Sequence, residues 1–163
     1  MIILPILTIP NALLKEISTP VEKVDKEIGL IVDNIKKTLY YHERCVGIAA
    51  VQVGILKRII VVDASRSAKE HRNNGLLIMI NPKVVYSSGK ISSREGCLSV
   101  PEFTGYVTRK KKIEVDYFDI NGCKRYLKTD GFESIVLQHE IDHLDGKIFL
   151  DRVSSLKTDI FRR

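Results

Sequence analysis

Residues 130–146, with the sequence DGFESIVLQHEIDHLDG, decide the fold of this chain. Asp130 followed by Glu133 matches a capping box at a helix N-terminus, and Gly146 supplies the left-handed residue that often ends a helix. Apolar and histidine side chains between these residues lie nearly all round the predicted helix instead of along one stripe. We therefore predict a helix of about 13 residues that is central in the domain, with its histidines turned inward.

His139, Glu140 and His143 in this helix form an H-E-x-x-H sequence. Residues four apart lie one turn apart on the same helix face, so both imidazoles can reach one divalent ion. Glu140 lies further round the helix, where it can contact a water on that ion. The alternative is a pair of core histidines bonded to carboxylates, with an unrelated glutamate between them. We favour a metal site because the match lies on a capped and buried helix.

A catalytic metal needs a third protein ligand. The candidates are Cys45, Cys97, Cys123, His42, His71, Asp145 and Asp151. Cys123 lies in a predicted turn and His71 in a polar stretch, so ordinary turn and loop roles are favoured for both. Cys97 follows Gly96 and precedes an extended run that ends at Pro101. These residues alone leave Cys97 open between a metal ligand and a buried, inert thiol.

Residues 46–52, VGIAAVQ, are mostly small and end in a polar amide. Small side chains allow another part of the chain to approach the backbone closely. The Gln52 amide could donate to a developing oxyanion or could simply satisfy a buried loop. Taken alone, this segment favours the second role.

The rest of the chain predicts an α+β fold. Residues 24–39 repeat apolar side chains at helical spacing, which predicts an amphipathic helix. Residues 58–63 and 76–80 are short apolar runs bounded by turn signals at 65–75 and 81–82, which predicts buried strands. Residues 113–118 alternate between the two faces of a strand, and Asn121-Gly122 predicts a hairpin turn into residues 124–128. The middle of the chain is therefore predicted to be antiparallel β-sheet.

Composition favours one soluble domain spanning residues 1–163, because 44% of the residues are hydrophobic and 28% are charged. No apolar run approaches the roughly 18 residues of a membrane span, and the N-terminus lacks the positive region and cleavage site of a secretory signal. Three cysteines at wide spacing favour a reducing cytoplasm over a disulfide framework. The net charge of +6, with basic residues at 109–112 and 162–163, favours a solvated surface over a nucleic-acid or ribosome partner.

Three segments together resemble the peptide deformylases, a family that removes the N-formyl group from nascent bacterial and organellar proteins. That family carries G-x-G-x-A-A-x-Q, E-G-C-x-S and Q-H-E-x-D-H in this order. This chain has CVGIAAVQ at 45–52, EGCLS at 95–99 and QHEIDH at 138–143. The resemblance covers essentially the whole chain. It implies antiparallel or mixed β-sheets around the H-E-x-x-H helix, the N-terminal amphipathic helix, and a C-terminal helix beginning near residue 154.

The resemblance also implies roles for the residues that match the family motifs. The metal ligands would be Cys97, His139 and His143, with Glu140 as general base. The oxyanion donors would be Gln52 and the backbone N–H of Leu98, supported by the pair Glu95 and Arg109. The substrate methionine would meet Val46, Phe132, Ile135 and Val136, with Gly47 on the substrate-binding strand and Ser93 in a neighbouring slot.

The implied cofactor is one divalent metal ion per chain, Fe²⁺ in the cell, with Ni²⁺, Co²⁺ or Zn²⁺ able to substitute. The implied substrates are N-formylmethionyl nascent peptides, hydrolysed in the cytoplasm to formate and a free N-terminus. Ribosome contact would use the basic C-terminal helix with Lys157, Arg162 and Arg163. No membrane or specific DNA partner is expected.

Cys45 departs from the family pattern because it replaces the first glycine of the first motif. Its side chain could narrow the cleft and weaken or abolish activity, or could oxidise with Cys97 if geometry allows. Two other functions remain alternatives at this point. One is a zincin-like peptidase that uses Asp145 or another downstream ligand, and the other is a non-catalytic, basic ribosome-binding module with a structural metal.

Overall fold

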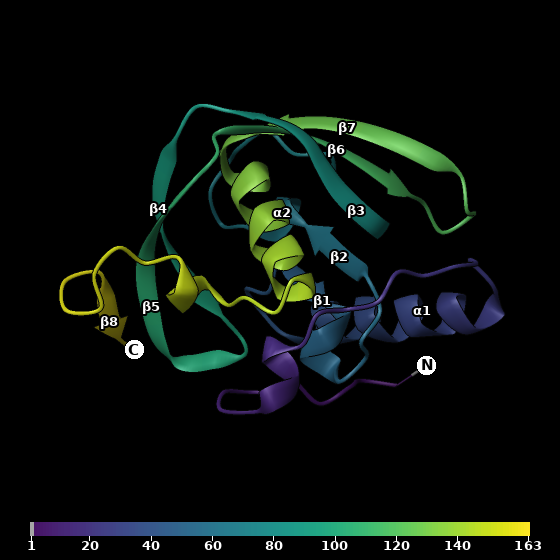
Figure 1. Cartoon of the computed structure of the whole chain (residues 1–163), viewed down its shortest axis with the longest axis horizontal. Helices are drawn as coiled ribbons and strands as arrows, with labels where there is room; N and C mark the ends of the chain where they lie inside the picture. The colour runs from purple at the N-terminus through teal and green to yellow at the C-terminus, as the bar shows by residue number, and fades with distance from the viewer. Residues whose placement is uncertain (1) are drawn as a thin grey trace.

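The computed structural model describes residues 2–163 and contains two antiparallel sheets with one long helix between them (Figure 1). The first sheet has the strand order β1-β2-β3-β6-β7, and the second has the order β4-β5-β8. The strands are β1 (Gly47–Ala49), β2 (Ile59–Asp63), β3 (Leu76–Ser88), β4 (Ile91–Cys97), β5 (Val100–Arg109), β6 (Lys112–Phe118), β7 (Lys124–Asp130) and β8 (Ile160–Arg162). The helices are α1 (Lys26–Tyr41) and α2 (Gly131–Leu144), with short 3-10 helices η1 (Ala12–Lys15), η2 (Ala50–Val53), η3 (Ala64–Arg66) and η4 (Phe149–Asp151). The α+β architecture predicted from the sequence is confirmed.

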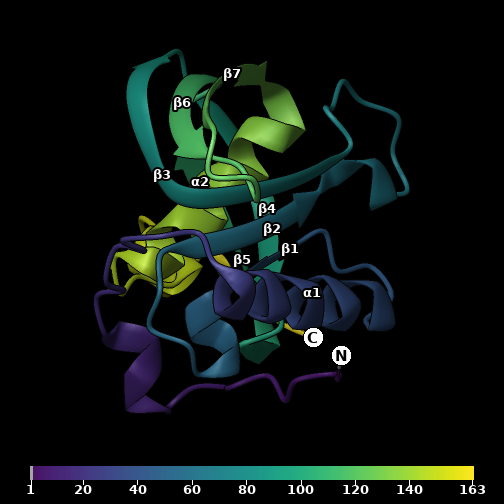
Figure 2. The same cartoon turned by 90° about the vertical axis from the view of Figure 1, so that its right-hand side faces the viewer.

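Strand β2 separates two hydrophobic cores, because all five of its residues are buried and successive side chains point to opposite faces. Ile59 and Val61 pack in the core beneath α1, whereas Ile60 and Val62 pack in the core that contains α2. Figure 2 shows α1 on one side of this strand and α2 on the other. The first sheet therefore gives α2 a rigid apolar support.

Helix α1 confirms the amphipathic helix predicted over residues 24–39. The Asp25 side chain caps it by accepting a hydrogen bond from the backbone N–H of Ile28 at 3.0 Å. Its apolar stripe, which includes Val32, Ile35 and Leu39, is buried against the first sheet. This helix has a structural role.

Helix α2 is buried on most sides, as predicted, but the expected capping box is wrong. The Asp130 side chain makes no cap hydrogen bond, and the Glu133 carboxylate turns instead to Asn74 and the Thr129 hydroxyl. These three donors satisfy a carboxylate that has no solvent exposure. At the other end, Gly146 has φ +71° and ends the helix as predicted.

Strand β3 is longer than predicted, since it continues through Asn81 and Pro82 to Ser88. The register against β6 shifts at this point, and Asn81 adopts φ +52° while its side chain bonds both backbone polar groups of Val21 at 2.8 Å. This irregularity accommodates a proline without ending the strand. The predicted hairpin is confirmed by β6 and β7, with Gly122 at φ +74°.

The predicted C-terminal helix is wrong. Residues 154–159 form bends and turns, and the chain then runs as β8 against β5, where Ile160 lies opposite Gly105. The Asp159 carboxylate accepts the backbone N–H of Ser155 and so stabilises the turn, while Phe161 packs under the Arg94 guanidinium. So short a segment gains little from helix formation, and it gains strand pairing here. No helix in the described residues is long and apolar enough to span a membrane.

Candidate metal centre

Three potential metal ligands converge where the end of β4 faces α2. Cys97 is the last residue of β4, and a register shift at Gly96 and Cys97 precedes the tight turn into β5. The Sγ of Cys97 lies 3.3 Å from Nε2 of His143, and the potential ligand atoms of Cys97, His139 and His143 all lie within 4.8 Å of one another. Within residues 2–163, none of the other candidate ligands named from the sequence joins this cluster.

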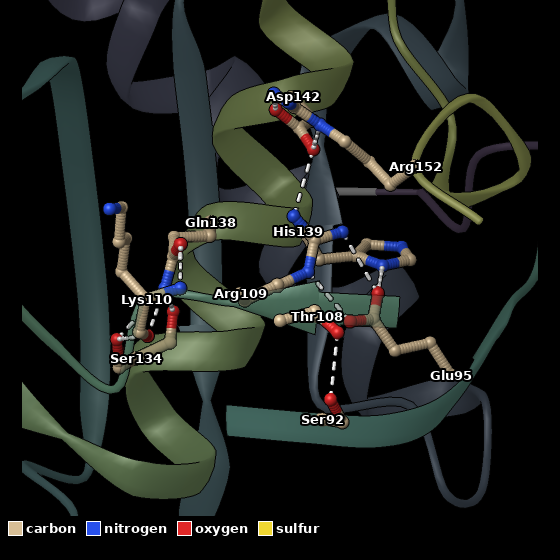
Figure 3. A network of polar contacts seen from close by, with 10 residues as sticks. All are labelled: Ser92, Glu95, Thr108, Arg109, Lys110, Ser134, Gln138, His139, Asp142 and Arg152. Atoms are coloured by element: carbon tan, nitrogen blue, oxygen red, sulfur yellow. Dashed lines mark hydrogen bonds and ion pairs between the residues drawn. The ribbon is translucent and has the colours of Figure 1, made fainter. Parts of the chain in front are cut away.

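A hydrogen bond from one side fixes the orientation of His139. Its Nδ1 lies 2.8 Å from Oε1 of Glu95, which leaves Nε2 as the ring nitrogen available to a metal. Glu95 is itself clamped by Arg109, whose Nε and Nη2 donate at 2.6 and 2.9 Å (Figure 3). The structure thus brings Glu95 and Arg109 together as the pair expected from the sequence. On another side, the Phe149 ring is stacked on the His139 ring, with the two ring centroids 6.3 Å apart.

Electrostatics favour a thiolate at Cys97. Burial alone would raise the pKa of this thiol, but the neighbouring imidazoles of His143 and His139 outweigh burial and hold the pKa well below its usual value. Burial would lower the pKa of His139, yet the bonds to Cys97 and Glu95 raise it well above its usual value. Burial also opposes ionisation of Glu95, and the bonds from His139 and Arg109 nevertheless lower its pKa. A Cys97 thiolate and a Glu95 carboxylate are therefore favoured in this buried cluster.

The donor set fits a divalent transition metal. One thiolate and two imidazoles are ligands of catalytic zinc and related ions, and three protein ligands leave a position for water or substrate. Among the described residues, Nδ1 of His143 and Oε2 of Glu140 are buried without a hydrogen-bond partner. His143 faces Cys97 with Nε2, so a metal in this cluster would not reach its Nδ1. The unpartnered Oε2 of Glu140 beside three converging donors fits a site built around a group that protein atoms alone do not satisfy.

Glu140 is packed against Gly47 across the interface between α2 and β1. A Cβ added to Gly47 would lie 2.7 Å from Oε1 of Glu140, so only glycine leaves room for this carboxyl. Glu140 is 4% exposed, and its burial raises the pKa of the carboxyl. The family resemblance implies a substrate-binding strand at Gly47, and in the structure this glycine also makes space for Glu140.

The Gln52 amide is held beside the thiol by the backbone of its own segment. Its Oε1 accepts the backbone N–H of Ala49 at 2.9 Å, which turns the NH₂ group toward Sγ of Cys97 at 3.4 Å and Oγ of Ser99 at 3.1 Å. Leu98 lies in the turn between Cys97 and Ser99. Gln52 and Leu98 are thus adjacent to the metal-ligand cluster.

Only some of the residues expected to meet a substrate methionine lie in one apolar cluster. Val46, Phe132 and Val136 pack in one apolar cluster beside the first sheet, and Ile135 is buried on the same helix. Ser93 lies on β4 opposite Val107, in the second sheet. Phe132 also contacts His71, whose ring centroid is 4.6 Å away, so that histidine packs against an aromatic ring in addition to facing solvent.

Cys45 belongs to the core beneath α1, not to the metal-ligand cluster. Its thiol donates to the Gly47 carbonyl oxygen at 3.3 Å. Burial, followed by the nearby Glu140 carboxyl, raises the pKa of Cys45 to about 12. The thiol is therefore neutral under ordinary conditions.

Sequence reasoning gave no role to several residues that support the site. Ser99 accepts from Gln52, and Asp142 accepts from Arg109 at 2.9 Å and from Arg152 at 2.7 and 3.0 Å. Ser99 and Asp142 stand inside the two motifs that contain the metal ligands, which was a usable signal. Arg152 lies beyond the helix in an ordinary-looking polar stretch, and the sequence offered no signal for it.

Comparisons with known proteins agree with this geometry. The polypeptide deformylase family matches residues 3–159. A peptide deformylase of Thermodesulfovibrio yellowstonii is 40% identical over 163 residues, covering 100% of this chain and 96% of its relative, and one of Baumannia cicadellinicola is 45% identical over 157 residues, covering 96% and 90%. The crystal structure of an Ehrlichia chaffeensis peptide deformylase in complex with actinonin is 41% identical with a TM-score of 0.87, covering 96% of this chain and 92% of that one. This chain belongs to the peptide deformylase family.

Proposed function

We propose that this enzyme removes the formyl group from the N-terminal formylmethionine of nascent proteins, releasing formate and a free N-terminus. The observation that carries the proposal is the convergence of Cys97, His139 and His143 beside the buried carboxyl of Glu140. The reaction is the hydrolysis of a linear amide, for which such an arrangement is suited.

Cys97, His139 and His143 would hold one divalent ion, and we expect Fe²⁺ in the cell, with Ni²⁺, Co²⁺ or Zn²⁺ as substitutes. Such an ion, when bound, would act as a Lewis acid and would lower the pKa of a bound water, so that hydroxide is available near neutral pH. Glu95 would keep His139 in the required tautomer by accepting the hydrogen bond from Nδ1–H.

Glu140 would act as the general base and then as the general acid. Its carboxylate would take a proton from the attacking water and return it to the departing amine. Burial raises the pKa of this carboxyl, which brings it closer to the range in which one group can perform both transfers near neutral pH. Gly47 supports this role by leaving space beside Oε1.

Gln52 and the backbone N–H of Leu98 would stabilise the oxyanion that develops on the formyl oxygen. The Ala49 N–H orients the Gln52 amide, and the N–H that faces Cys97 would turn to the oxyanion once that thiolate holds the metal. A well-placed donor of this kind contributes roughly 3 kcal/mol to transition-state stabilisation.

The substrate side chain would pack on Val46, Phe132, Ile135 and Val136, with Gly47 and Ser93 on flanking strands. We infer that the enzyme works in the cytoplasm as a single domain spanning residues 1–163. Ribosome contact also remains a prediction. Since the C-terminal segment forms turns and β8, such contact would present Lys157, Arg162 and Arg163 from these elements and not from a helix.

The test is a comparison of Glu140→Gln with the matched control Asp145→Asn, in protein purified anaerobically and analysed for metal. Glu140→Gln should retain the metal and lose about 10²- to 10⁴-fold in formate release from formyl-Met-Ala-Ser. Asp145→Asn should keep both metal and turnover, because Asp145 is bonded to Arg58 at the end of α2. Wild-type turnover in Glu140→Gln would contradict the proposal, and metal loss in Asp145→Asn would favour a zincin-like peptidase.

A further inference from the structure

We propose that Arg152 is a positioning residue for the metal centre: through Asp142, Arg109 and Glu95 it holds His139 in the orientation that presents Nε2 to the metal. The inference rests on the metal site proposed above. It concerns a residue outside the three sequence motifs, on the segment that follows α2.

A continuous chain of charged hydrogen bonds joins Arg152 to His139 (Figure 3). Arg152 donates to both carboxylate oxygens of Asp142, with Nη2 at 2.7 Å from Oδ1 and Nε at 3.0 Å from Oδ2. Asp142 Oδ2 also accepts from Nη1 of Arg109, while Nε and Nη2 of Arg109 donate to Glu95. Glu95 Oε1 then accepts from Nδ1 of His139.

Charge balance makes the outermost member of this chain important. The side chains of Glu95, Arg109 and Asp142 are 5%, 4% and 9% exposed, so one enclosed guanidinium serves two enclosed carboxylates. Arg152 supplies the second cation and satisfies Asp142 Oδ1, which has no other partner among the described residues. Without Arg152, Asp142 would compete with Glu95 for Arg109, and the bond that fixes the His139 ring would weaken.

The position of Arg152 in the chain supports the same role. It directly follows η4, whose Phe149 is stacked on the His139 ring. The η4 turn is anchored by Asp151, which accepts from the backbone N–H of Ile148 and pairs with Lys15. One short anchored segment thus constrains His139 in two ways, by ring packing and through the charged chain.

Arg125 provides a matched control. It donates from Nε to Asp119 at 2.7 Å, but this pair lies at the β6–β7 hairpin, and within residues 2–163 no hydrogen bond or ion pair joins it to the metal ligands. The side chain of Arg125 is 56% exposed, compared with 43% for Arg152. If Arg152 only contributed to a surface ion pair, the two arginines would behave alike.

The experiment measures how fast the Ni²⁺-loaded enzyme loses its metal to an excess of chelator. Arg152→Gln should lose metal about tenfold faster than wild type, at the lower end of the range for groups behind a metal ligand. Arg152→Lys keeps the charge without the two-pronged bond and should lose metal about threefold faster. Arg125→Gln should match wild type. In an Asp142→Asn background, Arg152→Gln should add no further effect.

A second readout is the visible absorption of the Co²⁺-loaded protein, which should change in Arg152→Gln and be largely restored in Arg152→Lys. Metal loss within twofold of wild type in both Arg152 variants would overturn the inference, as would equal acceleration in Arg125→Gln. If Arg152→Gln fails to fold, Arg152→Lys decides alone by the same criterion. A wild-type protein that bound no metal would overturn the proposed function and this inference together, whereas equal retention in wild type and the Arg152 variants would overturn only the inference.

Discussion

The two long helices are of similar length and lie on opposite faces of the first sheet, yet their buried surfaces differ in kind. The buried residues of α1 are apolar except for Thr38. Those of α2 include Glu133, His139, Glu140, Asp142 and His143. Helix α1 buries almost only apolar side chains, whereas α2 also buries polar and charged side chains that need hydrogen-bond partners.

Those partners come from other elements. Glu133 is satisfied by Asn74 and Thr129, His139 by Glu95, and Asp142 by two arginines. Because burying an unpaired polar group is costly, each such contact fixes the position of α2 as well as its own geometry. Changes in α1 should therefore alter stability alone, while changes around α2 should alter chemistry.

The largest expected effect belongs to α1. Ile35→Ala removes a fully buried side chain and should reduce the free energy of unfolding by about 2–5 kcal/mol. Turnover per folded molecule should stay within about twofold of wild type, because Ile35 belongs to the core beneath α1 and is not one of the residues of the metal-ligand cluster. Urea denaturation and active-site titration separate these quantities, and Leu30→Ala, at a side chain 54% exposed, is the control. A loss of turnover per folded molecule well beyond twofold would contradict the claim that changes in α1 alter stability alone.

Gly47→Ala should lower activity more than it lowers stability. The new methyl group would meet Glu140 Oε1 at 2.7 Å and displace the carboxyl, so kcat should fall about thirtyfold with a smaller change in stability. Gly29→Ala in α1 is the matched control, since nothing lies within 4 Å of its added Cβ. That variant should be neutral or stabilising by up to about 1 kcal/mol, owing to helix propensity. Full activity in Gly47→Ala would refute the placement of Glu140.

Ser99→Ala should cause a moderate loss of activity. It removes an acceptor of the Gln52 amide without touching a metal ligand, and the loss of one hydrogen bond corresponds to about 1 kcal/mol, or roughly fivefold in kcat/KM. Metal content should be unchanged. A hundredfold loss would show that Ser99 does more than orient Gln52.

Cys45→Ala should have the smallest effect. The pKa of Cys45 is raised to about 12 because burial disfavours the thiolate, so the side chain is uncharged below that pH and its removal changes no charge near Glu140. The profiles of kcat/KM against pH should coincide for variant and wild type from pH 6 to 9. A displaced profile would indicate that Cys45 influences the catalytic carboxyl.

Local patterns were enough to predict the elements that have strong periodicity. The stripe of α1, the apolar run of β2 and the Asn121-Gly122 hairpin encode their structures within a few residues, and all three predictions are confirmed. Three details depended on distant partners. Glu133 bonds Asn74 rather than completing a capping box, Asn81 allows β3 to pass Pro82, and β5 pairs with the segment predicted as a C-terminal helix.

The candidate site shows the same limit. The sequence motifs identified Cys97, His139 and His143, and the structure brings these three together. The residues alone left Cys97 undecided, because the proximity of β4 to α2 is a property of the tertiary fold. Arg152 could not be found from sequence, since its importance depends on a partner that itself acts through Arg109.

The most direct test of the account is X-ray absorption spectroscopy of the Zn²⁺-loaded protein at the metal edge. We predict one sulfur at about 2.3 Å and two imidazole nitrogens at about 2.0–2.1 Å, with the sulfur contribution lost in Cys97→Ser. A spectrum without sulfur in wild type, or one unchanged in Cys97→Ser, would contradict the assignment of Cys97, His139 and His143 as the metal ligands.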